Sequence, residues 1–189
     1  MALRPHPDAS VADWLVRSPT EPMELITLGP AGYDAYARLR FIPDPTGPGQ
    51  AEADVAVAED HPSDLDQARR ALHLLARFTT TPLECCFCVW EGYSDVTLPP
   101  SSPVVELPHR RYALLRGALT DLADWEATVG GCAPPAFAWP ADRRWCFTSD
   151  VDPHWAGIGA GRAAVGALVG APGLDVVPAR PGQARPAYR

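Results

Sequence analysis

The 189-residue chain contains no lysine, so its 16 basic residues are all arginines, against 23 acidic residues and a formal net charge of −7. Phosphate backbones repel such a balance unless the basic residues gather on one face. The charge therefore predicts no nucleic-acid partner. If the protein has a protein partner, we expect that partner to be basic, because opposite fields speed and orient an encounter.

Long apolar runs are also absent. No stretch approaches the roughly 18 consecutive apolar residues of a membrane-spanning helix, and the opening segment MALRPHPDASVADW lacks the apolar stretch of a signal peptide. Hydrophobic residues make up 47% and charged residues 21% of the chain, which is typical of folded globular proteins. We expect a cytoplasmic protein without a membrane partner, in which the five cysteines are reduced thiols.

Several catalytic motifs are missing as well. The sequence contains no G-x-S-x-G, no P-loop and no H-E-x-x-H, the patterns that would indicate a nucleophile elbow, a nucleotide phosphate site or a zinc protease. No cofactor is predicted, and the catalytic residues of an enzyme, if there are any, stay unknown. Chemistry-bearing side chains concentrate in a few short segments, which are described below.

The clearest periodicity lies in residues 63–78, where SDLDQARRALHLLARF places apolar residues at helical spacing behind a capping serine. Shorter helices are predicted at residues 10–18 and 120–127. Extended segments are predicted at residues 23–29, 85–92, 111–119, 143–151, 154–160 and 173–179. Helices and strands mix without regular βαβ alternation, which predicts an α+β fold.

The expected organisation is a single α+β domain with a mostly antiparallel sheet flanked by helices, covering residues 21–178. Residues 1–20 are predicted to form an N-terminal arm with a short helix. Residues 179–189 are predicted to form a flexible C-terminal tail with its arginines in solvent.

The segment LECCFCVWEGY (83–93) holds three cysteines within four positions. Its continuous apolar run indicates a strand buried on both faces. Successive side chains then point to alternate faces: Cys85, Phe87 and Val89 on one, Cys86, Cys88 and Trp90 on the other. Cys85 and Cys88 would not converge on one ion. Buried thiols acting as small hydrophobes are the favoured interpretation. The alternatives are a metal site that recruits His109 or His154, or a redox-active or nucleophilic cysteine.

In SDVDPHW (149–155), Asp150, Asp152 and His154 alternate. An extended chain would project all three from one face toward a divalent ion. The favoured alternative is that the two carboxylates accept hydrogen bonds in a turn before Pro153, with His154 exposed. No metal is predicted, and these three residues are the weak candidate ligands.

Aromatic and arginine side chains gather in AWPADRRWCF (138–147) and near the end of the cysteine segment. Both residue types are enriched in binding hot spots. The candidate binding residues are Trp90, Glu91, Tyr93, His109, Arg110, Trp139, Asp142, Arg143 and Trp145. In the alternative interpretation, residues 138–147 form a turn in which Asp142 bonds its own backbone and Trp145 enters the core.

Three ordered segments, FTTTPLECCFCVWEGY, LPHRRYALLRG and FAWPADRRWCFTSDVD, resemble a family of uncharacterised actinobacterial proteins. Its members carry the motifs T-x-T-P-x-x-C-x-F-x-x-W-E-G-Y, P-H-R-x-Y-x-L-F-x-G and W-P-x-D-R-x-W. The similarity covers roughly residues 30–178 and implies no activity, cofactor or catalytic residue. The matching positions are Thr81, Pro82, Trp90, Glu91, Gly92, Tyr93, His109, Arg110, Tyr112, Gly117, Trp139, Pro140, Asp142, Arg143, Trp145 and Asp152. The chain departs from the pattern at His154 and in residues 155–159, where relatives have a Thr-Tyr-Val-Gly-Gly turn.

Two functional hypotheses follow. The favoured one is a noncatalytic binding or interaction protein, and an immunity protein that neutralises a cationic toxin would fit the net charge. The alternative is a small metal-assisted hydrolase that uses Asp150, Asp152 and His154, or Glu91 with His109. The hydrolase requires a concave pocket in which those side chains converge.

Overall fold

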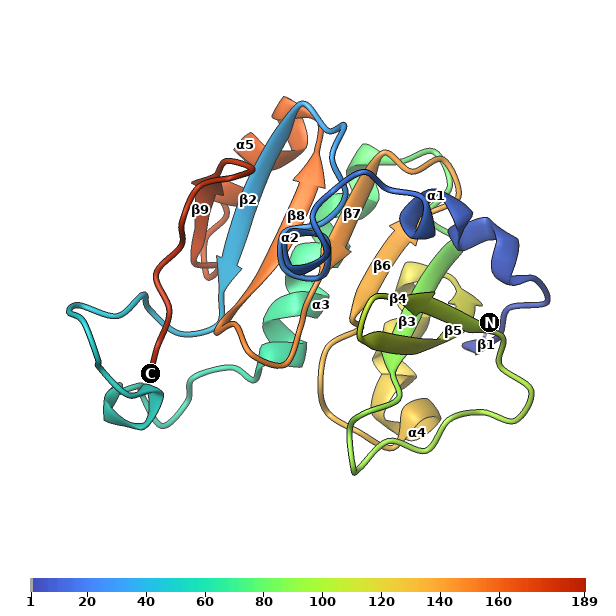
Figure 1. Cartoon of the computed structure of the whole chain (residues 1–189), viewed down its shortest axis with the longest axis horizontal. Helices are drawn as coiled ribbons and strands as arrows, with labels where there is room; N and C mark the ends of the chain where they lie inside the picture. The colour runs from blue at the N-terminus through green and yellow to red at the C-terminus, as the bar shows by residue number, and fades with distance from the viewer. Residues whose placement is uncertain (1) are drawn as a thin grey trace.

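The computed structural model describes residues 2–189, and within them nine strands form one antiparallel sheet in the order β1-β5-β3-β6-β7-β8-β2-β9, with β4 also paired to β5 (Figure 1). The predicted single-domain α+β fold is confirmed. The strands are β1 (Arg4–Pro5), β2 (Ala35–Arg40), β3 (Cys85–Trp90), β4 (Val104–Leu107), β5 (Arg110–Gly117), β6 (Phe137–Pro140), β7 (Trp145–Thr148), β8 (Trp155–Ala160) and β9 (Val176–Ala179).

Helices cover both faces of the sheet. In the view of Figure 1, α3 and α5 lie behind the sheet, while α1 and α2 lie in front of it. The α-helices are α1 (Asp13–Val16), α2 (Pro22–Thr27), α3 (Asp64–Leu75), α4 (Trp125–Val129) and α5 (Arg162–Val169), and short 3-10 turns are η1 (Ala9–Ala12), η2 (Glu52–Asp54), η3 (Ala76–Phe78) and η4 (Leu119–Asp124). Within residues 2–189, no helix combines the length and the apolar character needed to cross a membrane.

The longest helix, α3, begins where its sequence predicts. The side chain of Ser63 accepts a hydrogen bond from the Asp66 N–H at 3.1 Å, which satisfies one of the free amide groups of the first turn. Leu65, Leu72 and Leu75 are buried and face the sheet as one apolar stripe. Each such side chain stabilises the fold by about 1.5 to 3 kcal/mol when fully buried.

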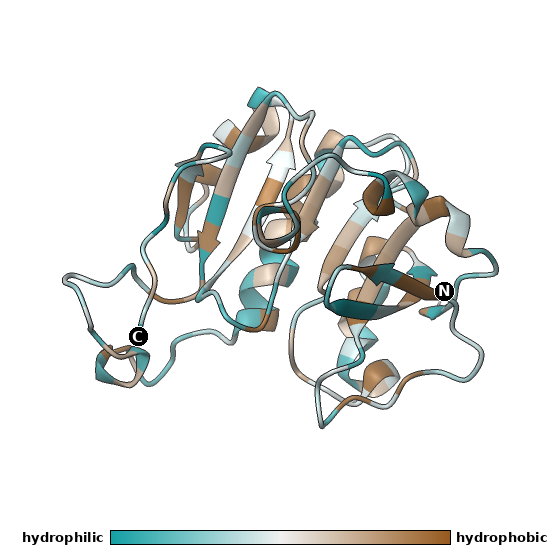
Figure 2. Cartoon of the chain, viewed as in Figure 1, coloured by the Kyte–Doolittle hydropathy of each residue, from teal (hydrophilic) through white to brown (hydrophobic). Residues whose placement is uncertain are grey.

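Side chains of β3 alternate between two separate apolar clusters, as the sequence predicts. Cys85, Phe87 and Val89 belong to the cluster beneath α3 and α5. Cys86 and Cys88 belong to the cluster on the other face, which α1 and α2 cover. Figure 2 shows the apolar residues running along the central strands, with polar residues concentrated in the loops. Both faces of the sheet are therefore core.

The strand predicted for residues 23–29 is wrong, because this segment forms helix α2. Pro22 occupies the first turn, and the side chain of Glu21 accepts from the Glu24 N–H at 2.9 Å. Proline suits the first turn of a helix because the N–H groups of that turn have no carbonyl partner within the helix, so no hydrogen bond is lost when proline lacks one. Leu25 and Ile26 are buried on the front face of the sheet. The apolar run is too short for its period to distinguish a helix from a strand.

Both chain ends contact the domain. In the predicted N-terminal arm, β1 joins the sheet and pairs with β5. In the predicted flexible tail, the Gly182 N–H donates to Glu24 Oε1 at 2.9 Å, and Arg185 forms an ion pair with Glu24 at 2.6 Å. The hydroxyl of Tyr188 donates to the carbonyl of Pro43. Arg185, predicted to be in solvent, is mostly covered, with its side chain 16% exposed.

Candidate functional site

The nine candidate binding residues do not form one surface patch. Cys85, at the start of β3, pairs with Pro140, whereas Trp90, at its end, pairs with Tyr112. A strand rises about 3.3 Å per residue, so these two ends lie roughly 17 Å apart. Three of the candidates, Trp139, Asp142 and Arg143, therefore lie near the start of β3. The candidates near its end are Trp90, Glu91, Tyr93, His109 and Arg110.

At the end of β3, the rings of Trp90 and Tyr93 meet edge to face with centroids 4.9 Å apart. The guanidinium of Arg110 lies over the Trp90 ring at 5.0 Å. The same group donates two hydrogen bonds to Asp150, at 3.1 and 3.0 Å. The Asp150 side chain is only 3% exposed. Arg110 therefore ties the aromatic pair to the loop that follows β7.

At the start of β3, the buried ring of Trp139 meets Trp14 edge to face at 5.7 Å. Arg143 lies over the other tryptophan, Trp14, at 5.5 Å. The backbone of Arg143 has φ 52, in the left-handed region that side-chain-bearing residues seldom adopt. This turn places an exposed arginine beside the aromatic pair.

Asp142 joins the turn after β6 to the segment before β3. Its carboxylate accepts from the Thr79 hydroxyl at 2.8 Å and from the Thr80 N–H at 2.8 Å. Burial alone would raise the pKa of Asp142, but these hydrogen bonds hold it below the ordinary value. The predicted bond to its own backbone is present as well, from the Arg144 N–H at 3.2 Å. Asp142 thus has a structural role that requires no ligand.

Trp145 lies in the core beneath α3 and α5 and is fully buried. The alternative interpretation of the sequence, in which this residue enters the core, is therefore confirmed. A ligand cannot contact the ring without opening the sheet–helix interface.

A pocket of about 410 Å³ opens beside Tyr93, the ring partner of Trp90, where β3 and β7 end and α3 begins. Its volume falls in the usual range of small-ligand sites, about 300 to 1,000 Å³. We call it the acidic pocket because five of its lining residues are carboxylic acids: Glu52, Asp64, Asp95, Asp150 and Asp152. Tyr93 and His154 also line it.

The carboxylates of the acidic pocket are unevenly neutralised. Arg110 binds Asp150 and comes within 3.8 Å of Asp152. No arginine or histidine of residues 2–189 forms an ion pair with Glu52, Asp64 or Asp95. Desolvation and the nearby carboxylate of Glu52 raise the pKa of Asp64, although the charge of His61 opposes them. The pocket therefore has an excess of negative charge that a cation would offset.

Two of the three candidate metal ligands contact Arg110, and the third contacts Asp44. Asp150 binds Arg110, and the Asp152 side chain is 75% exposed. His154 Nε2 lies 3.0 Å from Asp44 Oδ1, and its side chain is only 2% exposed. The expectation that His154 is exposed is wrong. Residues 2–189 contain no group of three or more His, Cys, Asp and Glu side chains arranged to hold a metal ion.

The alternative catalytic pair, Glu91 and His109, is also separated. Glu91 lies 3.6 Å from Arg111, measured between Oε2 and Nε. His109 sits exposed in the β4–β5 turn with φ 65. No hydrogen bond or ion pair joins the two side chains in the part of the chain that the structure describes.

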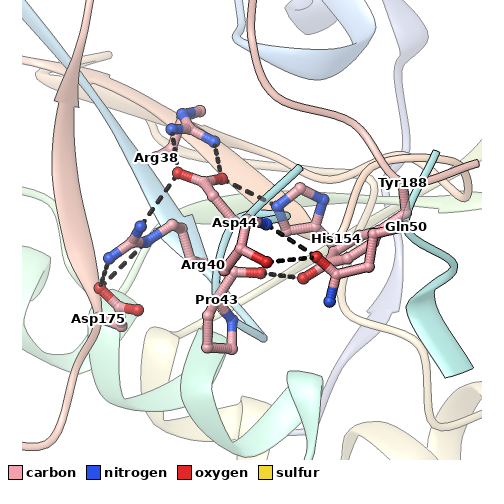
Figure 3. A network of polar contacts seen from close by, with 9 residues as sticks. Arg38, Arg40, Pro43, Asp44, Gln50, His154, Asp175 and Tyr188 are labelled. Carbon is pink, nitrogen blue, oxygen red and sulfur yellow. Dashed lines mark hydrogen bonds and ion pairs between the residues drawn. The ribbon is translucent and has the colours of Figure 1, made fainter. Parts of the chain in front are cut away.

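A network around Asp44 is the largest polar feature that the sequence did not predict (Figure 3). Its carboxylate accepts two hydrogen bonds from Arg38, at 2.7 and 2.9 Å, and one from Arg40 at 3.0 Å. Burial alone would raise the pKa of Asp44, but Arg38, His154 and Arg40 hold it far below the ordinary value. The sequence offers only a proline- and glycine-rich loop, PDPTGPG, at this place.

The C-terminal segment covers this network. Trp155 lies between two guanidinium groups, with Arg38 at 5.4 Å and Arg185 at 5.5 Å from the ring. Tyr188 meets the ring of His154 edge to face at 4.7 Å. The network thus joins β2, β8, the loop at residues 41–50 and the tail. We interpret it as structural, because every charged group in it has a partner.

The four β-strand cysteines are poor nucleophiles. Burial raises the pKa of Cys85, Cys86 and Cys146 to about 12, and it raises the pKa of Cys88 well above the ordinary value. These thiols stay protonated near neutral pH, whereas the thiolate is the form that attacks substrates and binds metals. Their packing as small hydrophobes agrees with the favoured interpretation of the sequence.

Comparison with known proteins gives no match, whether against protein-family models, curated proteins or solved structures. The actinobacterial family resemblance therefore stays a prediction.

Proposed function

We propose that the protein is a noncatalytic binding protein whose acidic pocket receives basic side chains of a protein partner. One observation carries this proposal: Glu52, Asp64 and Asp95 line a single pocket, and none of them forms an ion pair within residues 2–189. Carboxylates brought together without a counter-charge repel one another. Arginine or lysine side chains of a partner would supply that charge and orient the encounter.

The wall of the acidic pocket favours arginine over lysine in the partner. Tyr93 lines the pocket and is held by its contact with Trp90. A guanidinium can stack on an aromatic ring while its planar donors bind carboxylates, and an ammonium group cannot do both. Val151, 47% exposed, adds an apolar contact at the same pocket. Tyrosine is one of the residue types enriched in binding hot spots.

The specific form of the proposal is an immunity-like protein that binds and neutralises a basic protein in the cytoplasm. The net charge of −7 supports a basic partner. All five cysteines are unpaired thiols, which suits a reducing compartment. The metal-assisted hydrolase receives less support, because Arg110 contacts Asp150 and Asp152 whereas His154 contacts Asp44.

The proposal can be tested with defined peptides of equal length that carry arginine, glutamate or no charge. We expect the arginine peptide alone to bind, with amide shifts in the NMR spectrum at Tyr93, Asp95 and Asp152. High salt should weaken this binding because the contacts are electrostatic. The triple variant Glu52→Gln/Asp64→Asn/Asp95→Asn should bind the arginine peptide roughly tenfold less tightly or worse.

The matched control is Asp34→Asn/Glu59→Gln/Asp60→Asn, which makes the same change in charge at exposed residues that do not line the acidic pocket. We expect it to keep most of the affinity. Equal losses in the two triple variants would mean that net charge alone attracts the peptide. Binding of the glutamate peptide, or of none, would contradict the proposal.

A further inference from the structure

A second pocket, of about 360 Å³, lies at the opposite end of the sheet, where β3 begins and β5 and β6 end. Its lining includes four basic residues, Arg4, His6, Arg116 and Arg143, and a single acidic one, Glu84. We call it the cationic pocket. The positive charge of this pocket is opposite to the negative net charge of the chain. The composition of the chain therefore does not predict the pocket.

Strand register sets two of these arginines side by side. Arg4 of β1 pairs directly with Arg116 of β5, which pairs in turn with Cys86 of β3. Cys86 pairs with Trp139 of β6. Directly paired residues point to the same face of a sheet, and like charges in such a pair destabilise it. This row of paired residues therefore places the side chains of Arg4 and Arg116 next to each other, on the same face of the sheet as Trp139.

No internal counter-charge relieves this repulsion. Within residues 2–189, none of Arg4, Arg116 and Arg143 forms an ion pair. The Nε atom of Arg116 is buried and has no hydrogen-bond partner. A buried donor without an acceptor destabilises the folded state. Glu84, on the wall of the same pocket, is exposed and forms no ion pair with any of residues 2–189.

The remaining lining narrows the chemistry of a ligand. Val11 and Leu83 supply apolar walls, and Leu83 is 64% exposed. Burial raises the pKa of Cys86 to about 12, so its thiol adds no charge. Three arginines and one glutamate leave an excess of two positive charges. A phosphate monoester carries about −1.5 to −2 charges at neutral pH and offers three acceptor oxygens.

We propose that the cationic pocket binds a small organic phosphate, with the phosphate group on Arg4, Arg116 and Arg143 and the apolar body against Val11 and Leu83. Guanidinium forks match phosphate oxygens in pairs, and a phosphate group would supply the counter-charge that these three arginines lack within residues 2–189. This site is separate from the acidic pocket and does not depend on the proposed protein partner.

Phenyl phosphate, inorganic phosphate and phenol serve as probes, with affinity measured by titration calorimetry. We expect phenyl phosphate to bind more tightly than inorganic phosphate, because only the former has a body for the apolar walls. Phenol should not bind measurably. Phenyl phosphate should also raise the melting temperature of the protein. Lack of any calorimetric signal and any thermal shift with phenyl phosphate would overturn the proposal.

The decisive variant is Arg4→Glu, which places a carboxylate directly opposite Arg116. It should abolish phenyl phosphate binding, while replacing repulsion with attraction should raise the melting temperature by about 1 to 3 °C. Arginines with only a structural role would give a lower melting temperature. The matched control is Arg77→Glu, which makes the same charge change at an exposed residue that lines neither pocket.

A second variant, Arg116→Met, removes the orphaned donor without adding charge and should also lose phenyl phosphate binding. Undiminished binding in both variants would overturn the proposal. Neither variant should alter binding of the arginine peptide at the acidic pocket, so failure of one proposal is distinguishable from failure of the other.

Discussion

The acidic pocket and the cationic pocket lie at opposite ends of β3 and differ in how their charges are placed. Loops and the first turn of α3 supply the carboxylates of the acidic pocket. In the cationic pocket, the register of β1 against β5 supplies two of the arginines. The acidic pocket has the same sign of charge as the chain, whose net charge is −7, and the cationic pocket has the opposite sign. Net charge therefore describes the surface as a whole and does not predict the charge of an individual pocket.

The difference is clearest between two arginines of the same strand. Arg110, at the start of β5, donates two hydrogen bonds to the buried Asp150. Arg116, near the end of β5, has no ion pair among residues 2–189, and its buried Nε atom has no hydrogen-bond partner there. An arginine bound to a buried carboxylate holds the fold together, whereas an unpaired one is available to a ligand. Replacing Arg110 and Arg116 in turn by methionine tests whether the two arginines differ in this way.

The largest effect is expected for Arg110→Met. The substitution leaves the nearly buried carboxylate of Asp150 without its partner, and such a change costs about 3 to 5 kcal/mol of unfolding free energy. Urea denaturation measures the loss. The control is Arg111→Met, because the Arg111 side chain is 60% exposed and its ion pairs are longer than 3.4 Å; it should change stability by under about 1 kcal/mol. Equal costs at the two positions would refute the structural role of Arg110.

The next effect concerns the network beside the acidic pocket. Asp44→Asn should lower the unfolding free energy by about 2 to 3 kcal/mol at neutral pH, because Arg38 and Arg40 lose a charged acceptor. The folded-state pKa of Asp44 is depressed, so its contribution is fully present above the unfolded value, about pH 4. The contribution is lost as the pH falls from there toward the folded value. The wild-type protein should thus lose more stability than the variant on acidification below about pH 4, which thermal melts at several pH values would measure.

A small effect on stability is expected for Arg116→Met, in contrast to Arg110→Met. No charged partner is left behind, and methionine keeps much of the apolar stem that packs against the sheet. The unfolding free energy should equal the wild-type value or exceed it by up to about 1 kcal/mol, because the repulsion from Arg4 is removed. A loss as large as that of Arg110→Met would show that Arg116 has a buried partner and would end the contrast between the two arginines.

The smallest effects are ligand-linked pKa changes of opposite sign in the two pockets. Burial and the charge of Arg116 lower the pKa of His6, and a bound phosphate should raise it. The pKa of Asp64 is raised, and a bound arginine peptide should lower it. Phenyl phosphate should therefore raise the pKa of His6 when it binds, and the peptide should bind less tightly as Asp64 becomes protonated. NMR titrations of both residues, with and without each ligand, measure these shifts.

Local sequence predicted the elements whose signals are complete within a few residues. Helix α3 has its cap at Ser63 and a full apolar stripe, and β3 has a continuous apolar run whose alternation separates Cys85 from Cys88. Other elements lack such signals. Strand β1 has two residues, and β6 ends in a proline that reads as part of a turn. These strands exist because β5 and β3 offer them partners.

The candidate sites were predicted only in part. Trp90, Tyr93 and Arg110 do lie together, because they flank the neighbouring strands β3 and β5. The cationic pocket was missed, since Arg4 and Arg116 are joined only by strand register. The Asp44–His154 contact was missed for the same reason, because 110 positions separate the two residues.

Two glycines of β8 are required for a reason that the sequence alone does not reveal. A Cβ atom on Gly157 would lie 2.4 Å from the carbonyl oxygen of Thr27, and one on Gly159 would lie 2.4 Å from the ring of Tyr33. In the sequence they form part of a glycine-rich segment that could indicate a turn. In the fold they let α2 and the following loop cross directly over the sheet.

The sequence by itself determined the net charge, the capped helix α3 and the two-sided burial of β3, because each depends on composition or on neighbours a few residues apart. Tertiary structure alone decided which arginine meets a carboxylate and which meets another arginine. Electrostatic energy depends on distance in space, and only the pairing of distant strands sets that distance.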